Sequence, residues 1–266
     1  MKKCHKSCRR AEGSVITAQV ANVGAAAGAI LSLIFEPGQR PDIDAVFKLA
    51  DRSDEGIGFS VSHVAPADQG WIELLAMGLT FDCAGLVPGR SAPVPPPGTL
   101  LGLLEAPEGE VVTLAAGPHL GDAPGMQPAV RVLAGLGARL CGLPGVLSAV
   151  WRPAHAWMTP SYFRKVVGKW LDGGPFPALG LTTLERDRDG SIYTRGLALM
   201  TGQELRFAPD PKLGAADIAR IAVRLIHALI ETDPLTVAHQ FTGPSGETID
   251  VAPLPGLQFL RVTVRR

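Results

Sequence analysis

The chain has 266 residues, of which 46% are hydrophobic and 19% are charged. This composition supports a substantial buried core and excludes wholesale disorder, which requires low hydrophobicity or a high net charge. The 25 basic residues balance the 25 acidic ones, so the chain lacks the basic excess that phosphate contacts require of most nucleic-acid-binding proteins. We therefore expect no nucleic-acid partner.

The N-terminal segment, residues 1–26, predicts a poorly ordered arm because it has no clear hydrophobic period and many small residues. Its basic residues, followed by a mostly apolar stretch, also have the outline of a signal peptide or an anchor. Gln19 and Asn22 interrupt that stretch, and its uninterrupted part is shorter than the ~20 residues that span a bilayer. We expect a leader followed by a strand and no membrane partner, with export as the alternative.

The first half of the chain, residues 27–142, shows strand and helix signals in alternation. Strands are expected at residues 31–36, at 56–64, once or twice within 71–83, and at 110–116. Acidic residues near the start of residues 42–51, and Pro128 in a first turn, favour helices at these two places. The Pro- and Gly-rich residues 87–99 predict a connecting loop.

The second half, residues 143–266, repeats this alternation after a strand that begins at Val146. Thr159 and Pro160 together predict the start of a helix that runs to residue 171. Asp189 and Gly190 suit the positive φ angles of a hairpin turn. The remaining expected elements are hairpin strands at 178–185 and 191–201, a strand at 204–207, a helix at 215–231, and strands at 237–241 and 259–264.

An internal similarity links the two halves. Residues 29–37 (AILSLIFEP) resemble residues 145–153 (GVLSAVWRP), and both precede a helix signal and further strands. We interpret this as a duplication, with chance similarity as the alternative. The mixture of hairpins and helices predicts an α+β fold, in which two pseudo-repeated β-α-β-β-β-α units, residues 27–142 and 143–266, pack into one body with mixed or antiparallel sheets.

The second unit carries a further pattern in residues 193–197 (YTRGL) and 202–205 (GQEL). This pattern resembles the Thr-x-Gly-Leu, apolar run and Gly-x-x-Glu-like signature of a mostly bacterial family, the domain of unknown function 4261. The long helix and the final strand follow in the same order, so the resemblance covers roughly residues 146–264. It implies an α+β fold and no particular reaction. It identifies Thr194, Gly196 and Glu204 as the positions that match the family's marker residues.

Known chemical fingerprints give little support for a reaction. The chain contains no Gly-rich dinucleotide or phosphate loop and no Gly-x-Ser-x-Gly elbow. Four cysteines are too few for a disulfide framework, which favours a cytoplasmic protein. Cys4, His5 and Cys8 resemble half of a zinc site, but no second close pair accompanies them. We expect no cofactor and no metal.

Two groups of residues are candidates for a site. The first is His155, which lies between Trp151 and Trp157; strand alternation predicts that all three share one side. An imidazole between aromatic rings can bind a ligand or act as an acid or base, and the alternative is a packed edge of the core.

The second group joins Glu204 to Thr194 and Arg195 across the expected hairpin. A carboxylate that faces a hydroxyl and a guanidinium can form a polar site, and the alternative is a cross-strand network that sets the strand register. From both groups we expect a non-catalytic module that binds an unknown protein or small molecule. The alternative is an enzyme of unrecognised type that uses His155 and Glu204, which then have to share one pocket.

Overall fold

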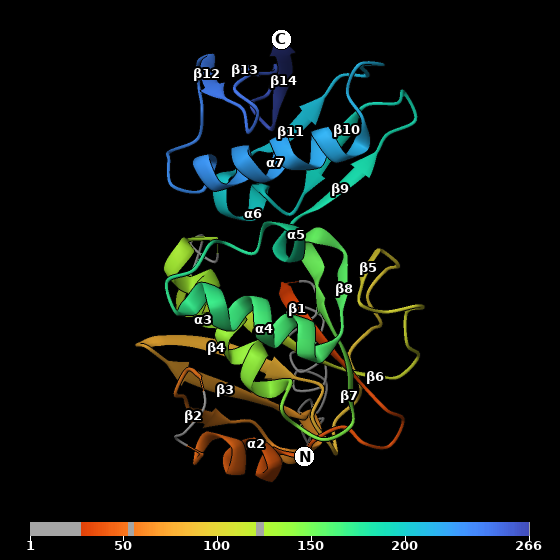
Figure 1. Ribbon diagram of the computed structural model, residues 1–266. Coiled ribbons are helices and arrows are strands. Elements are labelled where there is room, and N and C mark those ends of the chain that lie inside the picture. Colours follow the sequence, from red (N-terminus) through yellow and green to blue (C-terminus); the bar gives the residue numbers. More distant parts are fainter. Residues whose placement is uncertain (1–27, 53–55, 121–124, 266) are drawn as a thin grey trace, which may run out of the picture.

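The computed structural model describes residues 28–52, 56–120 and 125–265, which form two lobes, each built around a β-sheet (Figure 1). Within these residues, the larger sheet has eight strands in the order β2-β3-β4-β6-β1-β7-β8-β5. All neighbouring strands are antiparallel except β5 and β8, which run parallel. The strands are β1 (Ala29–Phe35), β2 (Ser60–Val64), β3 (Trp71–Ala76), β4 (Leu79–Ala84), β5 (Thr99–Leu101), β6 (Glu110–Ala116), β7 (Val146–Trp151) and β8 (Ala156–Met158).

Three helices, α2 (Ile43–Ala50), α3 (Gln127–Leu140) and α4 (Pro160–Leu171), pack with one face of this sheet in the main core. The opposite face holds a smaller apolar cluster, which the Pro-rich segment covers: Trp157 Nε1 donates a hydrogen bond to the carbonyl oxygen of Pro96 at 3.0 Å. Because both faces are covered, every residue of the central strand β1 is buried. The short 3₁₀ helices η1 (Ala67–Gln69) and η3 (Arg152–Ala154) connect strands, and η2 (Pro118–Leu120) lies between β6 and α3.

The smaller lobe has six strands among the described residues, in the order β12-β13-β14-β11-β10-β9. Strands β11 and β14 pair in parallel, and the other neighbours are antiparallel. Helix α7 (Ala215–Leu229) lies across this sheet, and its apolar stripe joins the main core (Figure 1). The other elements are α5 (Ala178–Leu181), β9 (Thr183–Arg186), β10 (Ile192–Arg195), α6 (Ala198–Thr201), β11 (Glu204–Phe207), β12 (His239–Thr242), β13 (Thr248–Pro253) and β14 (Phe259–Arg265).

The α+β class and the mixed sheets agree with the sequence analysis, but the duplication is not confirmed. Strands β1 and β7, which carry the similar sequences, lie side by side and antiparallel in the middle of the larger sheet. Strands on both sides of residue 142 therefore build one sheet. Moreover, the two sheets differ in their strand number and order.

Some expected elements have the bounds that their end signals predict. Helix α4 begins after Thr159, whose Oγ1 accepts a hydrogen bond from the backbone N–H of Tyr162 at 3.2 Å. The hairpin prediction is wrong at both outer ends, where α5 and α6 stand in place of strand residues. Gly196 has a φ of +94° and ends β10, so the chain turns into α6.

The expected arm at residues 1–26, with Cys4, His5 and Cys8, lies outside the described residues. The described helices include none with the length and apolar character needed to cross a bilayer. Strands β5, β8 and β13 are missing from the sequence-based prediction. In β5 and β8, three residues are too few to show an alternating pattern.

Candidate functional site

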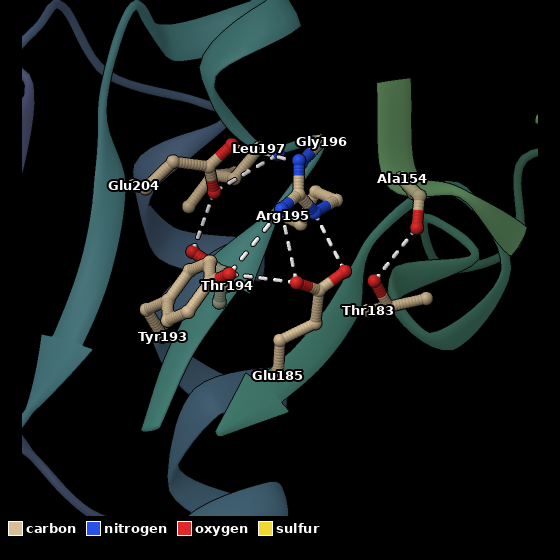
Figure 2. Close-up of polar contacts among 9 residues, drawn as sticks. All are labelled: Ala154, Thr183, Glu185, Tyr193, Thr194, Arg195, Gly196, Leu197 and Glu204. Atoms are coloured by element: carbon tan, nitrogen blue, oxygen red, sulfur yellow. Dashed lines mark hydrogen bonds and ion pairs between the residues drawn. The ribbon is translucent and has the colours of Figure 1, made fainter. Parts of the chain in front are cut away.

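The two lobes meet where η3 approaches the hairpin of β9 and β10 (Figure 2). The Thr183 hydroxyl on β9 donates a hydrogen bond to the carbonyl oxygen of Ala154 at 2.8 Å. Gly196 at the end of β10 is so close that an added Cβ would lie 2.8 Å from the Ala154 Cβ. These contacts bring His155, the residue after η3, beside the polar side chains of the hairpin.

Glu204 binds only groups of its own lobe. Its Oε1 accepts hydrogen bonds from the backbone N–H groups of Gly196 at 2.8 Å and Ala198 at 3.0 Å. Its Oε2 accepts from the Thr194 hydroxyl at 2.6 Å and the Leu197 N–H at 3.3 Å (Figure 2). Burial raises the pKa of Glu204, and these donors oppose the rise. The carboxylate therefore holds the turn between β10 and α6.

Thr194 is fully buried and links two strands through its hydroxyl, which also accepts a hydrogen bond from the backbone N–H of Leu205 at 2.7 Å. This geometry matches the cross-strand network that was the alternative interpretation of the Glu204 group. Arg195 does not join that network, because successive residues of a strand point to opposite faces of the sheet.

Arg195 instead pairs with Glu185, which is not among the candidate residues expected from the sequence. Its Nε lies 2.6 Å from Glu185 Oε1, and its Nη2 lies 3.0 Å from Glu185 Oε2. The Tyr193 hydroxyl donates to Glu185 Oε2 at 2.7 Å (Figure 2). Burial on its own would raise the pKa of Glu185, but the hydrogen bonds from Arg195 and Tyr193 lower it. This second network is half-buried and ionic.

His155 faces this second network and not Glu204. Its φ of +48° is in the left-handed region, which is unusual for a residue with a side chain. Its carbonyl oxygen accepts a hydrogen bond from the Thr99 N–H at 2.9 Å, which ties it to β5. Burial lowers the pKa of His155, the charges of Arg195 and Arg152 lower it further, and Glu185 opposes them. The imidazole is therefore mostly neutral at neutral pH.

Arg152, the first residue of η3, directly follows Trp151 and is a cation with little compensation. Its guanidinium is half-buried, and its Nη1 donates to the Ser32 hydroxyl at 3.3 Å. Among the described residues, no carboxylate oxygen lies within hydrogen-bonding distance of it. Burial lowers the pKa of Arg152. A partly buried guanidinium without a carboxylate partner keeps an uncompensated charge, which a bound anion would offset.

The two tryptophans do not flank His155 as expected. Strand alternation fails here because η3 interrupts it and makes β7 and β8 two arms of a hairpin. Trp151 lies in the main core beneath the helices, and Trp157 lies in the small cluster on the opposite face of the sheet. Their side chains are 0% and 2% exposed, so neither ring is available to a ligand.

The structure thus brings His155 and Arg195 together and separates both from the Glu204 network. The partners Glu185 and Tyr193 could have been found from the sequence, since the turn at residues 187–190 sets the hairpin register and places Glu185 opposite Tyr193. In residues 28–52, 56–120 and 125–265, no three His, Cys, Asp or Glu side chains form a group suited to a metal ion.

Comparisons with known proteins found none that is similar to this chain. No protein-family model, curated protein sequence or solved structure matches it. The chemistry of the junction therefore has to be judged from its own residues: Arg152 and Arg195 carry positive charge, Glu185 carries negative charge, and His155 is mostly neutral. The group has a net positive charge and can attract an anion.

Proposed function

We propose that this protein is a non-catalytic module that binds an anionic group of a small molecule or a partner protein at the lobe junction. The observation that carries the proposal is the half-buried guanidinium of Arg152, which has a serine hydroxyl but no carboxylate partner among the described residues. An anion bound there would offset the cost of burying this charge. The neutral ring of His155 would lie beside it as a hydrogen-bonding group.

The state of the two nearby carboxylates argues against catalysis by them. A general base needs a free oxygen within reach of the proton that it removes. Glu204 already accepts four hydrogen bonds from its own chain, and Glu185 accepts three from Arg195 and Tyr193. Taking a substrate proton would require these contacts to break first.

The guanidinium also indicates the class of ligand. Its planar N–H groups match the spacing of two oxygens on a carboxylate or a phosphate. These two sources share one chemistry, an oxyanion with neighbouring acceptor oxygens. A fully solvated lysine would provide a point charge without this match.

Backbone amide spectra recorded during titrations with inorganic phosphate and with acetate would test the proposal and separate the two sources. We expect saturable shifts at residues around η3, which Arg152→Gln abolishes. Arg186→Gln is the matched control, because Arg186 is exposed on the neighbouring strand β9 and donates to the carbonyl oxygen of Gly190. Equal shifts in both variants, or no shift near η3, would contradict the proposal.

The geometry of His155 favours one alternative, an enzyme of unrecognised type. Strained backbone positions often occur at active sites, and His155 combines a left-handed φ with a nearby carboxylate, Glu185. We propose that any such enzyme would use this pair in place of His155 and Glu204. His155→Asn tests it, because asparagine tolerates the left-handed region. A hydrolytic or transfer activity lost in this variant, with unchanged folding, would favour the enzyme over the binding module.

Two further expectations remain proposals. We propose membership of the domain of unknown function 4261 family, which is supported by the way in which Thr194, Gly196 and Glu204 share one hydrogen-bond network. We also propose a cytoplasmic location, which is supported by the buried free thiols of Cys83 and Cys141. Burial raises the pKa of each thiol to about 12, so neither is reactive.

A further inference from the structure

A cavity of about 910 Å³ lies in the larger lobe, apart from the residues of the junction. Four segments build it: α3, α4, the tip of the β3–β4 hairpin and the loop before β2. Its apolar walls include Ile57, Met77, Leu79, Val132 and Leu171. Small-molecule sites in proteins have volumes of roughly 300–1,000 Å³ and mostly apolar walls, so this cavity has the size of a ligand site.

A glycine keeps the cavity open on its α4 side. Gly168 lies inside the helix, and a Cβ built on it would meet no atom within 4 Å. Nothing in the packing therefore requires glycine at this position, although glycine destabilises a helix interior. The absence of a side chain leaves space that the cavity uses.

A methionine also lines the cavity. Met77 is 77% exposed and has a φ of +51° in the two-residue turn that it forms with Gly78. Such turns favour Asn-Gly, so methionine is a poor choice for the turn itself. A flexible thioether side chain adapts well to apolar ligands, which is the property that this position supplies to the cavity.

The charged residues that line the cavity balance each other among the residues that the structure describes. Arg131 and Asp172 have opposite charges, so this described lining has no net charge with which to attract an ion. Arg131 is also held in place: its Nη2 donates to the carbonyl oxygens of Trp170 at 3.0 Å and Leu171 at 3.2 Å, and its guanidinium lies 4.7 Å from the centre of the Trp170 ring. Its role is to stabilise the end of α4.

We infer that this cavity binds a small, uncharged and mostly apolar molecule. The inference is independent of the anion site at the junction, because the two sites share no residue. The occupant follows from the balanced charge of Arg131 and Asp172, the apolar walls and the open space at Gly168.

Fluorescence titration with N-phenyl-1-naphthylamine, an uncharged apolar dye, tests this inference on the full chain. We expect saturable binding that Gly168→Trp weakens at least about tenfold, because the indole takes up space in the cavity beside α4. Met77→Asn should also weaken it, while suiting the turn. Gly168→Ala, which adds little volume, and Lys169→Trp, which places the same ring on an exposed position outside the cavity wall, should bind like wild type.

Thermal unfolding followed by circular dichroism checks that each variant is folded. Absent dye binding, or equal binding by Gly168→Trp and Lys169→Trp, would overturn the inference. If the anionic dye 1-anilinonaphthalene-8-sulfonate binds more tightly than the uncharged dye, the inference that the ligand is uncharged is overturned. Sedimentation velocity tests whether a second copy of the chain occupies the cavity instead. A concentration-dependent dimer that Gly168→Trp abolishes would identify this face as a contact between two copies and overturn the inference.

Discussion

The two carboxylate networks around β10 have similar chemistry but different surroundings. Glu204 lies on one side, where a buried threonine hydroxyl and three backbone N–H groups use both of its oxygens. Glu185 lies on the other side, where a half-exposed arginine and a tyrosine bind it. The first network uses mainly backbone donors, and the second uses only side chains.

This difference separates a structural role from a role in binding. Backbone donors belong to the fold and do not move without it, so Glu204 fixes the turn into α6. Side-chain donors can rearrange around a ligand at small cost, and His155 and Arg152 lie on that side. Burial decides which network stabilises the protein, because a buried acceptor that loses its partner costs more than an exposed one.

The largest expected effect is the difference in the free energy of unfolding between Glu204→Gln and Glu185→Gln. The amide of glutamine places a donor against the N–H groups that now point at Glu204, so we expect a loss of about 2–3 kcal/mol in the free energy of unfolding. Glu185→Gln should cost only about 0.5 kcal/mol, since the pair is partly exposed. Urea unfolding measures both values, and equal losses would remove the distinction between the two networks.

A second comparison tests Gly196, which belongs to the Glu204 network and contacts Ala154 of the larger lobe. Gly196→Ala combines a φ of +94° with a contact of 2.8 Å to both the Ala154 Cβ and the Leu181 carbonyl oxygen, so we expect a loss of about 2 kcal/mol. Gly202→Ala has a φ of +71° and open space around it, and it should lose about 1 kcal/mol. A Gly196→Ala variant as stable as Gly202→Ala would show that the lobes do not meet tightly there.

A smaller effect is expected for Tyr193, which belongs to the Glu185 network. Tyr193→Phe removes the hydrogen bond that the hydroxyl donates to Glu185 and the one that it accepts from Arg195 Nη2 at 3.2 Å. It keeps the ring contact with Phe259, whose centroid lies 6.4 Å away. We expect a loss of about 0.5 kcal/mol, measured by urea unfolding. A loss as large as that of Glu204→Gln would mean that the Glu185 network stabilises the protein as much as the Glu204 network does.

The pH dependence of these losses should run in opposite directions. The folded pKa of Glu185 lies below its ordinary value of 4.5, so its contribution is present above that pH and is lost as the pH falls through the folded pKa. The folded pKa of Glu204 lies above 4.5, so its contribution is greatest below 4.5 and declines as the pH rises through the folded pKa. Urea unfolding of wild type and both glutamine variants between about pH 3 and 7 measures this; parallel slopes would contradict it.

Much of the local structure could be predicted from neighbouring residues. Thr159 and Pro160 place the start of α4 because a hydroxyl cap and a proline act within one turn. Asp189 and Gly190 set the β9–β10 turn and its register for the same reason. The α+β class follows from the alternation of such signals along the chain.

The partners in the candidate site depend on contacts between distant segments. Glu185 and Arg195 are ten residues apart and could be paired from the hairpin register, but nothing local shows that His155 lies near them. Nor does anything local show that, in the described part of the chain, the Arg152 guanidinium donates to the hydroxyl of Ser32, 120 residues away, and to no carboxylate. The position of β7 beside β1 is equally non-local. Local hydrogen bonds and torsion preferences act over a few residues and are written in the sequence, whereas burial and charge pairing depend on which segments pack together, and only the tertiary structure determines that.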